Sequence, residues 1–181
     1  MAAVFVPPMA AKAGPLPVGG DWLYEIKWDG VRVIATVAGE RVTMQSRSGK
    51  TNYALKEHGI VEALRKLPDG VYDGEMAVLD ANGRARRYGR GQRSLVLWDV
   101  LALGDVSVTN RPLVERRQML EDVVFAAKLE GQPIAISPVF EDGEALWQWV
   151  LEHEVEGLVA KRKSSRYEAG RRSGAWVKVK Q

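Results

Sequence analysis

Short apolar segments separated by turn residues follow one another along the first hundred positions, and this order limits the folds that the chain can adopt. Residues 22–37 and 41–46 have strand patterns on either side of Ala38-Gly39-Glu40, which supplies residues typical of a hairpin turn. A third segment, 71–79, runs into Asn82-Gly83, a strong hairpin signal. Strands joined by tight turns pair in antiparallel fashion, so the pattern predicts antiparallel sheets.

Helical periodicity appears between the strand-like segments. Residues 57–67 place Ile60, Leu64 and Leu67 at helical spacing before a turn at 68–70. Two further segments have the same period, and three more have strand patterns: helices at 113–129 and 144–154, strands at 95–103, 154–161 and 176–180. We therefore expect an α+β fold with mainly antiparallel sheets flanked by helices, and not a doubly wound parallel sheet.

Length and composition favour a single domain. The chain has 181 residues, of which 46% are hydrophobic and 27% charged, as in ordinary globular proteins. Residues 1–20 are expected to be loosely structured and residues 21–181 to form the domain. No apolar stretch approaches the roughly 18 residues of a membrane span, so we expect no membrane partner.

The absence of cysteine excludes several classes of chemistry. Without cysteine there is no disulfide framework, no thiolate metal site and no cysteine nucleophile, which fits a reducing cytoplasm. Two histidines are too few for a histidine-based metal centre.

Positive charge is concentrated in two places. Residues 161–181 contain eight lysines and arginines against one acid, Glu168, and five arginines lie between positions 84 and 93. Such runs are often solvated surface. Two of them in one domain favour a polyphosphate or nucleic-acid partner, because lysine and arginine bind phosphate oxygens.

The run from Glu25 to Arg32 contains groups suited to attack on phosphorus. Lys27-Trp28-Asp29-Gly30 supplies an amine, a carboxylate and a flexible joint, and Arg32 supplies a permanent cation. A lysine amine attacks only when deprotonated, which burial or neighbouring cations promote. Lys178 and Lys180 alternate on the last predicted strand, so they share one face and could supply that positive field. By itself, Lys-x-Asp-Gly is short enough to arise by chance.

Further motifs follow in order and remove that ambiguity. They are Ser46-Arg47-Ser48-Gly49, Asp73-Gly74-Glu75-Met76, Leu97-Trp98-Asp99, Glu156-Gly157-Leu158-Val159-Ala160-Lys161 and Trp176-Val177-Lys178-Val179-Lys180. The ordered set resembles the adenylation domain of ATP-dependent DNA ligases, in the covalent nucleotidyltransferase superfamily with its ATP-grasp-like catalytic fold. Pro8-Met9-Ala10 and the segments 111–116 and 167–173 look most like the bacterial end-joining ligases.

The resemblance implies a reaction through a lysyl-nucleotide. Lys27 would attack the α-phosphate of ATP, release pyrophosphate and carry AMP. The AMP would pass to the 5′-phosphate of a nick in double-stranded DNA, and the 3′-hydroxyl would then displace it to seal the strand.

The resemblance also assigns roles to the other motif residues. Around the nucleotide, Glu25 would accept a hydrogen bond from the adenine amino group, Trp98 would stack on the base, Glu75 would bind the ribose hydroxyls, Arg32 the ribose or a phosphate, and Lys178 and Lys180 the α-phosphate. Arg47 would receive the 5′-phosphate of the nick, and Glu156 would help to bind Mg²⁺ or Mn²⁺. Asp29 could orient Lys27 or bind the metal through water.

The family pattern continues beyond the last strand into an oligonucleotide-binding (OB-fold) barrel of about 100 residues, whereas this chain ends at Gln181. We therefore expect the chain to self-adenylate and to seal nicks only weakly when alone. We also expect it to be a monomer. An RNA ligase or a capping-type enzyme is an alternative that Glu25 argues against. An NAD-dependent ligase is disfavoured, because the residues before Lys27 are too few for the additional domain that recognises the nicotinamide half. A nucleic-acid-binding module with a vestigial pocket is a third possibility.

Overall fold

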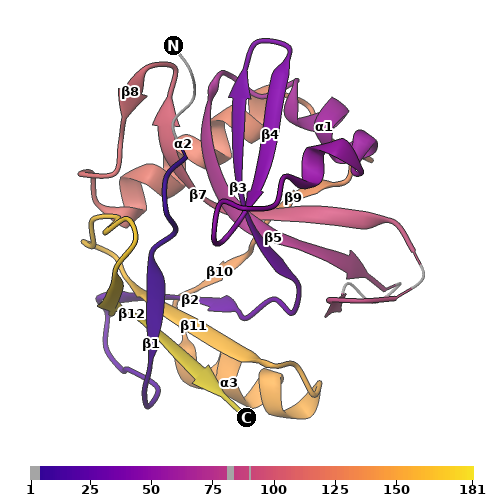
Figure 1. Cartoon of the computed structure of the whole chain (residues 1–181). Coiled ribbons are helices and arrows are strands. Elements are labelled where there is room, and N and C mark those ends of the chain that lie inside the picture. The colour runs from indigo at the N-terminus through magenta and orange to yellow at the C-terminus, as the bar shows by residue number, and fades with distance from the viewer. Residues whose placement is uncertain (1–4, 81–83, 90) are drawn as a thin grey trace.

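The computed structural model describes residues 5–80, 84–89 and 91–181, which form two β-sheets and three α-helices (Figure 1). The first sheet has the strand order β1-β12-β11-β2-β10, with the bounds Ala10–Ala13 (β1), Arg172–Lys180 (β12), Gly157–Arg162 (β11), Trp22–Ile26 (β2) and Val139–Phe140 (β10).

The second sheet has the order β4-β3-β5-β7-β8, with β6 paired to β5 and β9 paired to β7. Its strands are Arg41–Ser46 (β4), Val31–Ala38 (β3), Gly70–Leu79 (β5), Arg93–Leu103 (β7), Val106–Ser107 (β8), Ala85–Arg86 (β6) and Ile134–Ile136 (β9). The helices are a short 3-10 turn at Tyr53–Leu55, α1 at His58–Leu64, α2 at Leu113–Ala126 and α3 at Gly143–Glu152. Most strand pairs are antiparallel, and β1 with β12 and β7 with β9 are parallel. The predicted α+β class is therefore confirmed.

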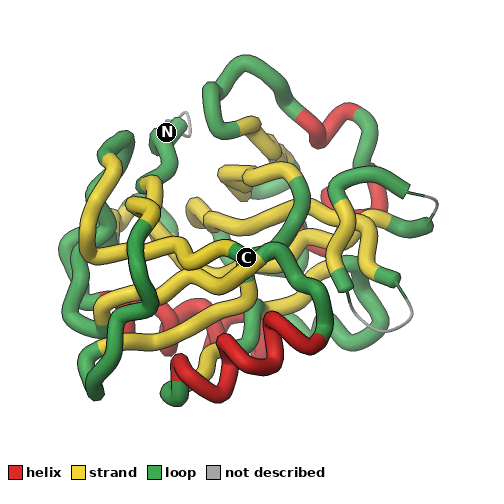
Figure 2. The backbone as a smooth tube through the Cα atoms, turned by 90° about the horizontal axis from the view of Figure 1, so that it is seen from below, coloured by secondary structure: helices red, strands yellow, loops and turns green. Residues whose placement is uncertain are grey.

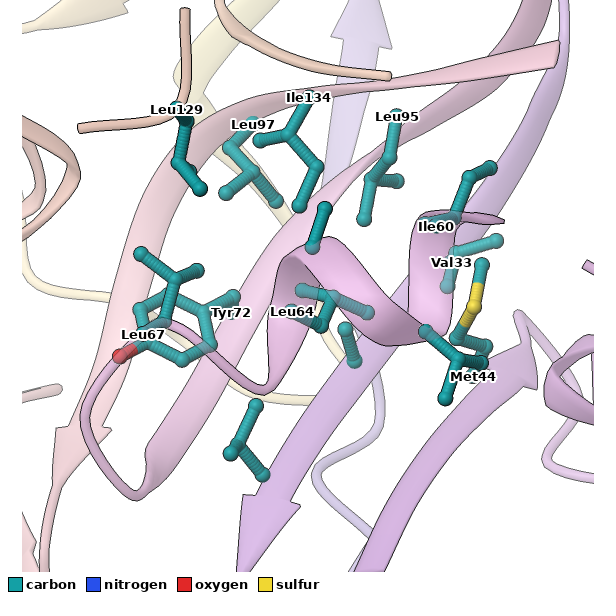
Figure 3. Close-up of a cluster of buried hydrophobic side chains, with 14 of the residues drawn as sticks. Val33, Met44, Ile60, Leu64, Leu67, Tyr72, Leu95, Leu97, Leu129 and Ile134 are labelled. Carbon is teal, nitrogen blue, oxygen red and sulfur yellow. The ribbon is translucent and has the colours of Figure 1, made fainter. Parts of the chain in front are cut away.

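Helices cover the outer face of each sheet. α1 and α2 pack on one face of the second sheet, where Ile60 and Leu64 of α1 lie against Val33, Tyr72 and Leu95 (Figure 3). α3 lies beneath the first sheet in Figure 1, and its Leu146 and Val150 pack among apolar residues of β2 and β11. Among the described residues, the helices fall short of the length and apolarity that crossing a membrane requires.

A third apolar cluster lies between the sheets. Ile34, Trp98 and Leu101 of the second sheet meet Trp176 of β12 there, together with Met9. This cluster joins the inner faces of the two sheets. The C-terminal strand β12 ends near the centre of the molecule when the molecule is seen from below (Figure 2). The molecule is thus layered as helices, sheet, sheet and helix, which leaves its inner faces available to build a pocket.

The structure corrects, for residues 9–13, the expectation that residues 1–20 are loosely structured; residues 1–4 lie outside the described part of the chain. Ala10–Ala13 form β1, which pairs with β12, and Met9 is fully buried. Segment 22–37, which the sequence presents as strand on both sides of a joint, divides into β2 and β3 in different sheets. Asn82-Gly83 and Arg90 lie outside the described residues, although β5 and β6 on either side of the predicted turn do pair antiparallel.

Candidate active site

A pocket of about 730 Å³ opens between the two sheets. Eight lysine and arginine side chains line it, against two glutamates, Glu25 and Glu75. A pocket of this size suits a small molecule, and the excess of cations favours a polyanionic one.

The structure brings the motif residues together around this pocket. Of the residues to which the resemblance assigns a role in the reaction, eight line it directly, namely Glu25, Lys27, Arg32, Arg47, Glu75, Trp98, Lys178 and Lys180. Glu156 lines an adjacent hollow that shares Lys27 and Trp28 with the pocket, and the exposed Asp29 lies in the same hollow. The expected cluster therefore exists as a spatial arrangement, assembled from segments up to 155 positions apart in the sequence.

Lys27 lies where the chain leaves the first sheet. Its backbone N–H donates to the carbonyl oxygen of Gly157 over 2.9 Å, so the residue stays attached to the start of β11. Gly157 has a φ of +150°, and a side chain there would collide with the carbonyl oxygen of Val179. Glycine is required at this point because both the dihedral angle and the close approach exclude a Cβ atom.

Glu156 bridges two lysines at the edge of the pocket. One carboxylate oxygen lies 2.5 Å from the Lys27 Nζ atom and the other lies 2.9 Å from the Lys180 Nζ atom. Partial burial acts to raise the pKa of Glu156, but the hydrogen bonds from Lys27 and Lys180 prevail and lower it. Glu156 is therefore an ionised acceptor that fixes the position of the Lys27 amine.

Glu25 is more deeply buried than its expected role suggests. Its carboxylate accepts a hydrogen bond of 2.7 Å from Lys161, and both side chains are only 3% exposed. The Lys161 ammonium lies 5.0 Å and 4.5 Å from the ring centroids of Trp98 and Trp176. Burial lowers the pKa of Lys161, and Glu25 opposes that effect. One oxygen of Glu25 is thus already engaged, and a base in the pocket would meet the rest of the carboxylate.

Arg32 is held by a buried carboxylate. Its Nε and Nη2 atoms donate to the two oxygens of Asp73 over 2.9 Å and 2.6 Å, and its guanidinium lies over the ring of Trp98. Tyr167 donates a hydrogen bond of 2.7 Å to the same carboxylate. Arg32 therefore presents to the pocket a guanidinium that is already anchored on one side.

Glu75 also lines the pocket, on β5, where it is the register partner of Arg32 on β3. Burial raises its pKa to about 7, although Arg32 and Lys27 act in the opposite direction. Near neutral pH this carboxyl is thus only partly ionised, and in its protonated form it can donate as well as accept.

Cations cluster along the wall formed by β12. Burial and repulsion from Arg172, Lys180 and Lys27 lower the pKa of Lys178. Lys178 and Lys180 both line the pocket, which agrees with the alternation expected from the sequence. Arg172 and Arg87 also line it; the sequence placed them in the two basic runs but assigned neither a specific role.

The acidic side chains near the pocket decide whether the site could bind a metal ion. Within the described parts of the chain, no cluster of three or more histidine and acidic side chains could hold an ion by itself. A single ionised carboxylate such as Glu156 fits Mg²⁺, because this ion commonly takes one or two carboxylates and completes its shell with phosphates and water.

Together, the two-sheet fold and a lysine in a cation-lined pocket define a nucleotidyltransferase domain of the ligase type. The family model described as "ATP dependent DNA ligase domain" matches residues 10–180, and the chain belongs to this family.

Curated proteins and solved structures agree with this assignment. The probable DNA ligase of Sorangium cellulosum is 36% identical over 180 residues, which cover 86% of this chain and 32% of that protein. The multifunctional end-joining DNA repair protein LigD of Mycobacterium tuberculosis H37Rv is 33% identical over 184 residues, which cover 96% of this chain and 24% of that protein.

Among solved structures, mycobacterial DNA ligase D complexed with ATP and MES superposes with a TM-score of 0.81 at 28% identity, covering 97% of this chain and 60% of that one. By length, this chain spans about a quarter to a third of the two curated proteins named above.

Proposed function

We propose that this chain is the adenylation domain of an ATP-dependent DNA ligase and that Lys27 is its nucleophile. The observation that carries the proposal is the Lys27–Glu156–Lys180 cluster at a cation-lined pocket, in a chain of this family. The complex of mycobacterial DNA ligase D with ATP supports the choice of nucleotide.

Lys27 forms a covalent bond to AMP in the first step, and this bond is broken in the second. The neutral amine attacks the α-phosphorus of ATP and a nitrogen–phosphorus bond forms. The bond to the β-phosphate breaks to release pyrophosphate, and the amine gives up one proton to solvent. An oxygen of the 5′-phosphate at a nick then takes the AMP and frees the amine. Finally, the 3′-hydroxyl attacks the same 5′-phosphate and AMP leaves.

The pocket residues orient the nucleotide for this attack. Glu25 accepts from the adenine amino group, Trp98 stacks on the base, Glu75 binds the ribose hydroxyls, and Arg32 binds the ribose or a phosphate. Lys178 and Lys180 bind the α-phosphate and stabilise the charge that develops on it. Their common position around one pocket supports these assignments.

Glu156 would hold Mg²⁺, or Mn²⁺, together with phosphate oxygens of the nucleotide. The bound ion would reduce the negative charge that repels the incoming amine. Because Glu156 also holds the Lys27 amine, the same carboxylate would serve both the nucleophile and the ion.

The DNA partner is nicked duplex. The exposed Arg47, which lines the pocket, suits the 5′-phosphate, and Arg87 in the pocket and Arg84 and Arg86 in the adjacent hollow add cations near Lys27. An OB-fold domain would act as the partner domain, as the greater length of the relatives allows, and the cysteine-free composition fits a cytoplasmic location.

Intact-mass measurement after incubation with ATP and Mg²⁺ tests the proposal. We expect a gain equal to one AMP in the wild-type chain and none in Lys27→Ala, whereas Lys66→Ala, which removes an exposed lysine beyond α1, should form the adduct normally.

An adduct that persists in Lys27→Ala would show that another side chain carries the AMP and would overturn the assignment of Lys27. Absence of the adduct from the wild type under forcing conditions would overturn the enzyme assignment and favour a nucleic-acid-binding module. Competition by GTP separates the remaining alternative, because a capping-type enzyme would take GMP in preference to AMP.

A further inference from the structure

Two crossovers between the sheets meet beside Lys27. Residues 27–30 lead from β2 in the first sheet to β3 in the second, and residues 137–138 lead from β9 in the second sheet to β10 in the first. At their meeting point the indole Nε1–H of Trp28 donates a hydrogen bond of 2.9 Å to the Ser137 hydroxyl. The residue after the nucleophile is therefore tied by its side chain to a segment 109 positions away.

Ser137 is a rigid anchor for this bond. It is fully buried, its N–H donates to the Leu97 carbonyl oxygen over 2.8 Å, and its own carbonyl accepts from the guanidinium of Arg117 on α2. Its backbone is thus fixed to β7 and to a helix, and its hydroxyl can move only by rotation about one bond.

The turn that carries Lys27 is held at two other points. Before the turn, the Lys27 N–H is bonded to Gly157. After it, Gly30 lies so close to the Met76 carbonyl oxygen of β5 that a side chain would not fit. Trp28 lies between these points, lines the pocket, and would swing with the turn if the indole were released.

We propose that Ser137 and Trp28 form a positioning pair that sets where the Lys27 amine lies relative to the nucleotide. This inference rests on the proposed function of Lys27. Neither side chain takes part in bond making. They restrict the turn to the arrangement in which the amine faces the α-phosphorus. The rate of attack on phosphorus depends steeply on that geometry.

Single-turnover self-adenylation of Ser137→Ala and Trp28→Phe tests the pair, since each variant removes one partner of the bond. Ser137→Ala removes only the hydroxyl, and Trp28→Phe keeps an aromatic ring at its position. We expect the rate constant at saturating ATP to fall by about tenfold to a hundredfold, as displacement of a reacting group does. The final fraction of adenylated protein and the ATP concentration at half-maximal rate should stay unchanged. The double variant should be no slower than the slower single variant, because both lose the same bond.

Tyr72→Phe is the matched control, because it removes another hydrogen bond of a buried residue, from the Tyr72 hydroxyl to the Pro68 carbonyl oxygen, away from the pocket. It should leave the rate constant at the wild-type value.

Wild-type rate constants in both variants, or effects that multiply in the double variant, would overturn the positioning role. A loss confined to the adenylated fraction would also overturn it, since that pattern reports misfolding. If Ser137→Ala does not fold, Trp28→Phe alone decides, because it keeps an aromatic ring at a half-buried position. A wild type that forms no adduct would instead defeat the proposed function, so the two failures are distinguishable.

Discussion

Two carboxylates at the pocket have pKa values displaced in opposite directions. Glu156 is held ionised by Lys27 and Lys180, whereas burial raises the pKa of Glu75 to about 7. Carboxyl groups with diverging pKa values in one site can serve different roles. Here Glu156 is an ionised acceptor for the amines of Lys27 and Lys180, and Glu75 changes its protonation near neutral pH.

The raised pKa of Glu75 predicts a pH-dependent stability. Its ordinary value is 4.5, so the folded state binds the proton more tightly than the unfolded state does. The stabilisation is complete below pH 4.5 and is lost as the pH rises towards 7. Glu75→Gln stays neutral, so relative to the wild type it should gain about 3 kcal/mol in unfolding free energy between pH 4.5 and 8, as an upper estimate.

Urea unfolding of both proteins across this range measures the difference. Glu168→Gln, an exposed glutamate outside the pocket, should show no such pH-dependent gain. A gap between Glu75→Gln and wild type that is the same at both ends of the range would contradict the prediction.

Motif residues were predictable as a group, but their partners were not. The hydrogen bonds of Lys161 with Glu25, Tyr167 with Asp73 and Trp28 with Ser137 join residues 136, 94 and 109 positions apart. No local pattern marks such pairs, because their geometry exists only once the sheets have assembled. Lys161 ends a motif and Tyr167 begins a recognisable segment, so their presence was visible while their contacts were not.

At the scale of elements, one buried arginine joins α2 to the second sheet. The Arg116 guanidinium makes two hydrogen bonds of 2.8 Å to the Asp99 carboxylate of β7, and both side chains are fully buried. It also donates to the carbonyl oxygens of Arg111 and Ser165. Asp99 follows Trp98 directly, so this contact fixes the strand position that carries the expected base-stacking residue.

Removing this arginine should be strongly destabilising. Arg116→Met leaves Asp99 buried without a counter-charge, and we expect a loss of about 3–5 kcal/mol in unfolding free energy. Arg111→Met breaks an exposed ion pair with Glu115 and should cost less than about 1 kcal/mol. Denaturant unfolding measures both, and equal losses in the two variants would refute the distinction.

Long elements were predictable and short ones were not. The helical periods at 57–67, 113–129 and 144–154 correspond to α1, α2 and α3 within a few residues at each end. In contrast, β8, β9 and β10 contain two or three residues each, too few to show alternation, and they are strands only because a neighbouring strand pairs with them. The division of 22–37 between two sheets was also invisible, because both halves have strand character.

At the scale of the whole molecule, the pocket belongs to neither sheet alone. Glu25 and Lys27 come from the first sheet and the turn after it, whereas Arg32, Glu75 and Trp98 come from the second sheet. A ligand between them contacts both layers, so its binding should stabilise the molecule as a unit.

Nucleotide should therefore raise the unfolding temperature of Lys27→Ala, the variant in which binding occurs without reaction. At about a hundredfold excess over Kd, ATP should add about 2.7 kcal/mol to the unfolding free energy. Tripolyphosphate, which offers the charges without adenosine, should have a smaller effect at equal concentration. Equal shifts of the unfolding temperature would show that only the cationic side chains contribute to binding and that Glu25 and Trp98 make no contact with the adenine base.

The strands that border the two sheets are short in the described parts of the chain. β1 and β10 close the first sheet with four and two residues. In the second sheet the edge strand β4 has six residues. On the outer side of β4, the N–H groups of Met44 and Ser46 donate to the side chain of Asn52 and to the carbonyl oxygen of Thr51. Long open strand edges recruit further chains, and such edges are missing among these residues. Concentrated samples for crystallisation or magnetic resonance should therefore resist intermolecular β-sheet formation.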